Sequence, residues 1–274
     1  MKNIKSKKYT FTIFGHTGFI GSHLKKKLKN QKLILPKRNQ LLFKKNLGHI
    51  IYCIGSDNWK KDPHNSFLAN IGYLPKILSK NKFLSFNYIS SIKVYNNLKI
   101  GKENSTLKIN PSSKEDYFMI KKACAEAYLL AQKKNIKILR LTNIFGDNYE
   151  APLALPAFIR NSVNSKKIFL TINKNSLKDY LSIQDAINII IKIVISGKNN
   201  IYNIASSKRV PLITIAKKIQ KITKCKIILK NQGLIINEPK IDISKIKKEF
   251  KFKQSLDIIK CVKFLVEDFK KKNK

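Results

Sequence analysis

The chain has 274 residues, of which 56 are basic and 16 are acidic, so its formal charge is +40. Because 43% of its residues are hydrophobic, it can bury a sizeable core, which excludes disorder along its whole length. Its length predicts one large domain, or two small ones that share a core.

The charge first suggests a polyanionic partner, but its composition weakens that interpretation. Only four basic residues are arginine, whereas the chain holds 52 lysines, 42 isoleucines and 27 asparagines. AT-rich codons produce this composition in core and surface alike. Nucleic-acid sites more often use arginine, for forked contacts with phosphates and bases. We therefore attribute most of the charge to genome composition and expect no nucleic-acid partner.

No segment predicts export, a membrane span or a metal site. The apolar run after the basic N-terminus, Tyr9 to Phe14, is too short for a signal peptide. No apolar stretch reaches the roughly 20 residues that a membrane span needs. The four cysteines lie far apart, without the spacing of metal ligands. We expect a cytoplasmic protein with reduced cysteines, no metal and no membrane partner, and a homodimer stays open as its oligomeric state.

In chain order, strand-like runs alternate with helical ones through the first 146 residues. The predicted strands are Tyr9–Phe14, Lys32–Leu35, Ile50–Ile54, Phe86–Ile89 and Ile136–Leu141. The predicted helices are Phe19–Leu28, about Ser66–Ser79, and Lys114–Lys133. Short apolar runs between longer helices are typical of a parallel sheet covered on both faces.

After Gly146 the pattern is less regular. We predict helices over Asp185–Ile195, Ile213–Ile222 and Leu256–Phe269, and strands over Ile201–Ile204 and near Lys226–Leu229. The tail Lys270–Lys274 is expected to fray. The predicted fold class is therefore α/β, with a doubly wound parallel sheet and a small C-terminal α/β part.

Three glycines at the spacing GxxGxxG come directly after the first predicted strand. Such glycines let the chain turn tightly, let the backbone approach a pyrophosphate, and let the next helix pack on the strand. The free N–H groups of that helix's first turn favour the same anion. The strand–turn–helix context therefore predicts a dinucleotide site. The loop residues that we expect to bind the cofactor are Gly15, Thr17, Gly18, Phe19, Ile20 and Gly21.

A second motif, YxxxK, is formed by Tyr117 and Lys121 on the predicted helix Lys114–Lys133. Residues i and i+4 lie on one helix face, so both side chains point the same way. A tyrosine hydroxyl is a weak acid, and an ammonium beside it favours the phenolate. Ser91, at the end of the Phe86–Ile89 strand, is expected to hydrogen-bond the same substrate oxygen. We predict Ser91, Tyr117 and Lys121 as the catalytic set, with Tyr117 and Lys121 also contacting the cofactor.

These motifs resemble the extended short-chain dehydrogenase/reductases, the NAD-dependent epimerase/dehydratase family that modifies nucleotide sugars. The resemblance covers nearly the whole chain. Tyr88–Tyr95 resembles the family's SSxxVY strand end, Leu139–Gly146 its LRxxNxxG strand, and Lys178–Asp185 its RDFxHVxD segment. It implies a dinucleotide-binding Rossmann domain over 1–146 plus about 177–205. The substrate-binding part is then expected over about 147–176 plus 206–274.

The resemblance also implies further site residues. Ile54 and Gly55 belong to a strand end that runs beneath the cofactor, and Asn70 falls at the family's helix asparagine. Asn143 is expected to face the substrate. Lys178 replaces an arginine that binds the diphosphate of a nucleotide sugar, and a lysine still supplies a charge for phosphate.

The segment after the second strand predicts the choice of cofactor. NAD enzymes usually place a carboxylate there for the ribose 2′-hydroxyl, but this chain has Lys37 and Arg38. Arg38 can bind a 2′-phosphate in a fork, so we predict NADP, with NAD as the alternative. The segment 39–48 is shorter than the family usually has, which indicates that a strand and a helix are trimmed.

The residues after Ser91 limit the reaction. The family's 4,6-dehydratases carry an Asp-Glu pair there, whereas this chain has Ile92 and Lys93, so 4,6-dehydration is not expected. A simple Ser/Tyr/Lys set suits a 4-epimerase or a 4-keto-sugar reductase, each acting by hydride transfer at a carbinol/keto carbon of a nucleotide sugar. Surface polysaccharide biosynthesis is the expected setting. Two alternatives stay open: a non-catalytic NADP-sensing regulatory protein on the same fold, and a reductase of a non-sugar carbonyl compound.

Overall fold

The largest part of the fold is a six-stranded parallel sheet, in a computed structural model that describes residues 8–38, 40–55, 60–230 and 232–273. Every pair of neighbouring strands in it is parallel. In spatial order the strands are β10 (Ile201–Ile204), β6 (Ile136–Leu141), β4 (Ser85–Ser91), β3 (His49–Tyr52), β1 (Thr10–Phe14) and β2 (Lys32–Ile34). Parallel strands end on the same edge, so the loops that follow β1, β3, β4 and β6 meet there.

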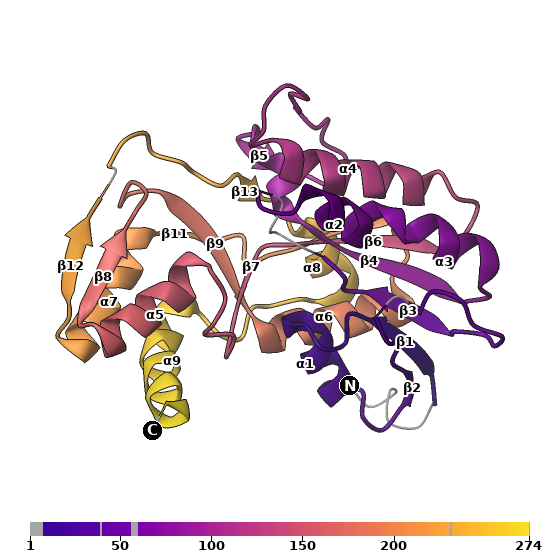
Figure 1. The fold of residues 1–274 in the computed structure, drawn as a ribbon, viewed down its shortest axis with the longest axis horizontal. Coiled ribbons are helices and arrows are strands. Elements are labelled where there is room, and N and C mark those ends of the chain that lie inside the picture. The colour runs from indigo at the N-terminus through magenta and orange to yellow at the C-terminus, as the bar shows by residue number, and fades with distance from the viewer. Residues whose placement is uncertain (1–7, 39, 56–59, 231, 274) are drawn as a thin grey trace.

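Helices cover both faces of this sheet (Figure 1). On one face lie α1 (Phe19–Lys27) and α6 (Ile183–Ser196), whose apolar side chains join the sheet in one core. The other face carries α2 (Pro63–Phe67), the π-helical turn η2 (Leu68–Gly72), α3 (Leu74–Lys80) and α4 (Tyr117–Leu130). The predicted α/β class with a doubly wound parallel sheet is confirmed.

Smaller sheets lie beside the first one. They are β7 (Asn143–Phe145) with β9 (Leu177–Ser182) and β11 (Arg209–Pro211), β8 (Lys167–Leu170) with β12 (Lys226–Leu229), and β5 (Ile100–Gly101) with β13 (Lys240–Ile241). The other helices are the 3₁₀ turn η3 (Ile92–Tyr95), α5 (Ala154–Asn164), α7 (Leu212–Thr223), α8 (Ser244–Phe250) and α9 (Ile258–Lys272). Helices α5, α7 and α9 enclose a second apolar core. The predicted domain boundaries stay a prediction; within the expected Rossmann part, β10 joins the large sheet whereas β9 pairs outside it.

Prediction and structure agree best at the apolar strands. β6, β10 and β12 have the predicted bounds. The predicted bounds of the third strand are wrong by one to two residues. The prediction is Ile50–Ile54, whereas β3 covers His49–Tyr52. The described residues of the segment 39–48 form no helix or strand, in line with the expectation that this region is trimmed.

The helix predicted over about Ser66–Ser79 is wrong as a single element, since α2, η2 and α3 replace it. Pro75 lies in the first turn of α3 and has no N–H group with which to continue a helical ladder. In η2 the N–H of Tyr73 reaches back five residues to the carbonyl of Leu68, at 3.3 Å. This wider turn changes the direction in which the following side chains point.

We predict from the sequence that the tail Lys270–Lys274 frays. This prediction is wrong for the residues of the tail that the structure describes as helix. α9 continues through Lys272, and Asn273 caps it. The ammonium of Lys272 lies 3.0 Å from Asp268 and 3.4 Å from Asp147. These carboxylates favour a helical last turn because the lysine has partners only when the turn is formed.

A buried ion pair joins α4 to the sheet. Arg140 in β6 and Glu126 in α4 are 5% and 4% exposed, and their closest atoms are 2.5 Å apart. Ser90 donates a hydrogen bond to the same carboxylate, and Arg140 also donates to the hydroxyl of Tyr95. The pair therefore fixes how α4 is rotated about its own axis.

We expect Glu126→Gln to lower the free energy of unfolding by about 3–5 kcal/mol, because it leaves a buried guanidinium without its counter-charge. Urea denaturation measures the loss. Glu267→Gln is the matched control: its pair with Lys263 is at 3.9 Å and exposed, so we expect a loss of at most about 0.5 kcal/mol. Equal small losses in both variants would contradict the role given to the buried pair.

Candidate active site

The predicted glycine loop lies between β1 and α1 and has the geometry that its glycines require. Gly15 has φ +77°, a conformation that favours glycine. A Cβ atom at Gly21 would lie only 2.2 Å from the carbonyl oxygen of Gly15, so a side chain there would force the loop apart. Gly18 begins α1 without a side-chain cap. The first N–H groups of α1 therefore suit an anion such as a pyrophosphate.

A cavity of about 330 Å³ lies next to this loop, at the ends of β2 and β3. Three of its lining residues, Arg38, Ile54 and Gly55, are ones that we predict to bind the cofactor. Asp62 lines it as well, and hydrogen bonds from Asn65 lower the pKa of this carboxyl group. The cavity thus presents a cation and a carboxylate together.

Two polar groups converge on Gly55 from the helical side of the sheet. A Cβ atom at Gly55 would lie 3.8 Å from Oδ1 of Asn70 and 3.9 Å from Nζ of Lys122. Asn70 is fully buried and its Oδ1 accepts no hydrogen bond from the described residues. Lys122 bonds the hydroxyl of Tyr88 at 3.2 Å and the carbonyl of Ile89 at 3.1 Å. Together with the glycine loop, this polar edge fits a dinucleotide.

The three predicted catalytic side chains do not form one cluster: Tyr117 and Lys121 contact α2, whereas Ser91 lies at the end of β4. Tyr117 donates its hydroxyl hydrogen to the carbonyl of Pro63 at 3.0 Å, and the ammonium of Lys121 lies 2.8 Å from Oγ of Ser66. Both partners belong to α2. Ser91 ends β4 and accepts a hydrogen bond from the backbone N–H of Lys93 at 3.2 Å. The structure thus turns Tyr117 and Lys121 toward α2, and no hydrogen bond among the described residues joins either of them to Ser91.

The rotation of α4 explains this arrangement. Ala125, Glu126 and Leu129 face the sheet, and Lys122 lies on the same side of the helix. Each residue of an α-helix is turned by about 100° from the one before, so Tyr117 and Lys121 point toward α2 instead. Phe118 precedes Lys122 by four residues, and its ring lies 4.8 Å from the ammonium groups of both Lys93 and Lys121.

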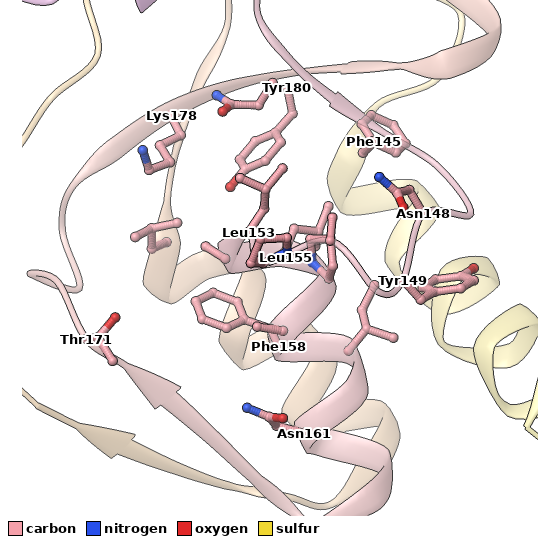
Figure 2. A pocket seen from close by; sticks show the side chains of 18 of the residues that line it. Phe145, Asn148, Tyr149, Leu153, Leu155, Phe158, Asn161, Thr171, Lys178 and Tyr180 are labelled. Atoms are coloured by element: carbon pink, nitrogen blue, oxygen red, sulfur yellow. The ribbon is translucent and has the colours of Figure 1, made fainter. Parts of the chain in front are cut away.

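A larger cavity of about 680 Å³ is lined mainly by the segments that form β7, α5, β8 and β9 (Figure 2). Asn143 and Lys178, both predicted to bind substrate, line it. Figure 2 shows Lys178 and Tyr180 at one end of the cavity and Asn161 at the other. Phe19, at the start of α1, also lines it. The cavity therefore reaches from the glycine loop to the predicted substrate residues.

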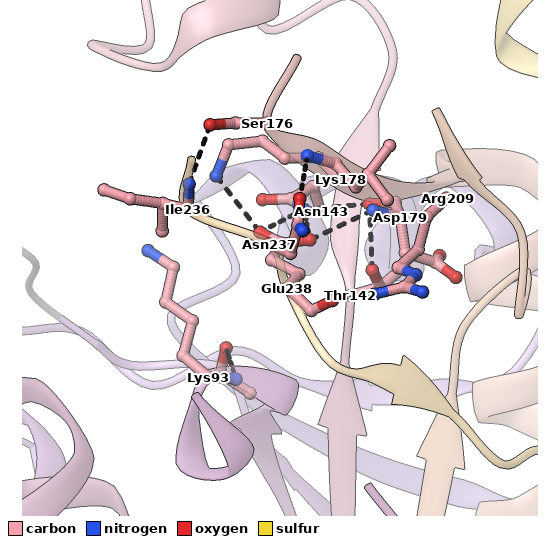
Figure 3. Close-up of polar contacts among 12 residues, drawn as sticks. Lys93, Thr142, Asn143, Ser176, Lys178, Asp179, Arg209, Ile236, Asn237 and Glu238 are labelled. Carbon is pink, nitrogen blue, oxygen red and sulfur yellow. Dashed lines mark hydrogen bonds and ion pairs between the residues drawn. The ribbon is translucent and has the colours of Figure 1, made fainter. Parts of the chain in front are cut away.

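A carboxylate that is not predicted from the sequence contacts both residues that we expect to bind substrate (Figure 3). Glu238 is 6% exposed and accepts hydrogen bonds from Nδ2 of Asn143 at 2.9 and 3.0 Å. Nζ of Lys178 lies 3.2 Å from it, and the N–H of Asp179 donates to it at 3.0 Å. Arg209 donates to the backbone carbonyl of Glu238 at 2.8 Å. Glu238 therefore neutralises Lys178 within the protein itself.

Residues 40–205, more than half of the chain, match the NAD dependent epimerase/dehydratase family. The chain belongs to this family. It is 27% identical to a dTDP-D-glucose 4,6-dehydratase of Dictyostelium discoideum, in a match that covers 77% of this chain and 61% of that protein. The chain thus spans less than two thirds of the length of that relative.

Solved structures of other proteins share the fold. UDP-glucose 4-epimerase from Thermotoga maritima with UDP-glucose is 17% identical, with a TM-score of 0.76 over 97% of this chain and 100% of that one. RMD from Pseudomonas aeruginosa complexed with NADPH is 14% identical, with a TM-score of 0.78 over the same shares of the two chains. At these identities the likeness shows the fold alone.

Two features are absent from the residues that the structure describes. No described helix is long and apolar enough to cross a membrane. In the same residues no group of three or more His, Cys, Asp or Glu side chains could hold a metal ion.

Lys122, Asp62 and Glu238 are not among the residues predicted from the sequence. For Lys122 a signal exists: Glu126 follows it by one helical turn, and a carboxylate that must pair with the strand arginine Arg140 places Lys122 on the sheet side of α4. No local signal marks Glu238, because its partners Asn143 and Lys178 are 95 and 60 residues away. Asp62 resembles an ordinary helix cap.

The buried carboxyl group of Asp179 is expected to make the stability of the protein depend on pH. It is fully buried beneath Glu238, and burial raises its pKa from 3.8 to about 6. Because the folded chain then holds this proton more tightly than the unfolded chain, the carboxyl group contributes stability below about pH 4. That contribution is lost as the pH rises through about 6.

We expect Asp179→Asn to gain stability relative to the unmodified chain as the pH rises from about 4 to about 7. The difference in free energy of unfolding should change by on the order of 3 kcal/mol, the equivalent of the shift in pKa. Urea denaturation of both proteins across this range measures it. Parallel pH profiles would show that Asp179 does not titrate with a raised pKa.

Proposed function

We propose that the chain binds NADP and a nucleotide sugar, and transfers hydride at a carbinol/keto carbon of the sugar, as a 4-epimerase or a 4-keto-sugar reductase. One observation carries the proposal: Phe19 of the glycine loop, Asn143 and Lys178 line the same cavity. A dinucleotide held at the loop and a sugar held by Asn143 would therefore meet. The UDP-glucose and NADPH in the two solved relatives support this choice of ligands. Surface polysaccharide biosynthesis is the setting that we propose.

The bound dinucleotide would supply the hydride acceptor or donor. Ser91 at the end of β4 would hydrogen-bond the reacting oxygen of the sugar, and Tyr117 would take or give the proton at that oxygen. Lys121 would favour the phenolate. This arrangement requires the Tyr117 hydroxyl to exchange its bond with Pro63 for one with the substrate. Ile92 and Lys93 supply no acid–base pair after Ser91, so we do not propose 4,6-dehydration.

A second candidate is binding of the same ligands without hydride transfer, as in a regulatory protein. The position of Tyr117 favours it, since its hydroxyl bonds α2, while Lys122 lies next to Gly55 and Phe118 stands one helical turn before Lys122. A phenylalanine cannot act as an acid or a base. The ammonium of Lys122 would still contact a bound dinucleotide.

We expect Arg38→Asp to lower the affinity for NADPH at least about 10-fold relative to NADH, because it replaces the fork for the 2′-phosphate by a like charge. Fluorescence titration of the reduced dinucleotides measures both affinities. Asp62→Asn is the matched change in the same cavity and should raise the affinity for NADPH. An unchanged ratio of the two affinities in Arg38→Asp would contradict the preference for NADP.

We expect Tyr117→Phe to lower kcat at least about 100-fold on the nucleotide sugar that proves to be turned over, since it removes the proton donor and acceptor. Tyr128→Phe, also on α4, should leave kcat unchanged. The assay incubates the purified chain with a panel of nucleotide sugars and NADPH, after any retained dinucleotide has been identified. Tightly retained NAD(H) without net consumption indicates an epimerase, and loss of NADPH indicates a reductase.

Two results would overturn the catalytic assignment. Full turnover by Tyr117→Phe would show that Tyr117 is not the acid–base. Binding of a dinucleotide and a sugar nucleotide with no turnover of any member of the panel would favour the second candidate. Lys121→Met and Lys122→Met form a matched pair that shows which of the two ammonium groups contacts the dinucleotide.

A further inference from the structure

The large cavity carries positive charge that the protein balances only in part. Three lysines line it, Lys93, Lys178 and Lys230, whereas none of the described lining residues is an aspartate or a glutamate. Glu238, behind the lining, neutralises Lys178 at 3.2 Å. Neither of the other two lysines forms an ion pair with a described residue.

Lys93 differs from Lys230 in its position. It is the second residue of η3, directly after β4, and its backbone N–H donates to Oγ of Ser91 at 3.2 Å. Its side chain is half-buried and its ammonium lies 4.8 Å above the ring centre of Phe118. Lys230 is exposed at the end of β12, with its ammonium 4.9 Å from the ring of Phe169. Lys93 is therefore the cation next to the proposed reaction centre.

The surroundings of Lys93 favour an anionic ligand. An ammonium that is partly removed from water loses hydration, and an anion at hydrogen-bond distance offsets that loss. The ring of Phe118 supplies a weak attraction without neutralising the charge. In Figure 3 no contact joins the ammonium of Lys93 to Glu238. Within the part of the chain that the structure describes, the ammonium of Lys93 thus has no carboxylate counter-ion at the wall of the cavity.

We propose that Lys93 binds a carboxylate on the sugar itself, so that the substrate class is a nucleotide-linked uronic acid. This inference rests on the proposed nucleotide-sugar site. The pyrophosphate of the dinucleotide belongs to the glycine loop, and Lys178 and Asn143 serve the substrate at the β7–β9 end of the cavity. Lys93 starts from the strand end that carries Ser91, where the sugar ring must lie for its oxygen to reach Ser91. The carboxylate is the common anionic substituent that a sugar ring can bring to that point.

Calorimetric titration of the full chain, with NADP present, tests the proposal with two matched pairs of ligands: UDP-glucuronic acid against UDP-glucose, and GDP-mannuronic acid against GDP-mannose. In at least one pair we expect the uronic acid to bind about 10-fold more tightly, the size typical of one charge-assisted hydrogen bond. Lys93→Met should abolish this preference and leave the affinity for the neutral sugar unchanged. Lys230→Met, the matched control, should retain the preference.

Each of the other possible results of these titrations contradicts either the role of Lys93 or the proposed function. Equal affinity of the unmodified chain for both members of the pairs that bind overturns the role of Lys93 and leaves the proposed function intact. An equal loss for both members in Lys93→Met also overturns it, because Lys93 then binds the diphosphate. Binding of none of the four nucleotide sugars overturns the proposed function, and this inference with it.

Discussion

The buried pair of Glu126 and Arg140 determines what the carboxyl edge of the sheet presents to a ligand. A helix that lies on a sheet can rotate about its axis until some contact fixes it. Here that contact is one carboxylate on α4 facing one guanidinium on β6, shared with Ser90 and Tyr95. With this contact in place, Lys122 points to the sheet edge and Tyr117 points to α2. The chemistry available at the site therefore depends on the phase of one helix.

The few acidic residues carry more information about this protein than its many lysines. The chain holds so many lysines that the presence of one lysine at a position is weak evidence for a functional site there. The buried carboxylates each join segments that are distant in sequence. Glu238 joins β7 to β9, Asp185 joins α6 to the segment before α9, and Glu103 accepts the backbone N–H of Asn203 in β10. In a chain with 16 acidic residues, these three carboxylates therefore connect segments that lie far apart in the sequence.

The sequence predicts what depends on neighbouring residues. Apolar runs such as Ile136–Leu141 become strands because only a buried sheet accommodates them, and Gly15 and Gly21 stand where a side chain would not fit. Prediction from the sequence fails where residues that are distant in the chain determine the orientation of an element or the environment of a side chain. The phase of α4 is set by Arg140, 14 residues beyond Glu126, and the environment of Lys178 is set by Glu238, 60 residues later. A motif such as YxxxK fixes spacing along a helix, but it does not fix the direction in which the helix faces.

The short pairing of β13 with β5 has a consequence for the order in which the chain folds. Lys240 and Ile241 add to Ile100 and Gly101, and this contact anchors the segment that carries Glu238. Until residue 241 has been synthesised and docked, Asn143 and Lys178 are without the carboxylate that orients them. Pairings over such long sequence separations form late, because their loops must close first. The cavity that Asn143 and Lys178 line can therefore be completed only after residues 240 and 241 have paired with β5.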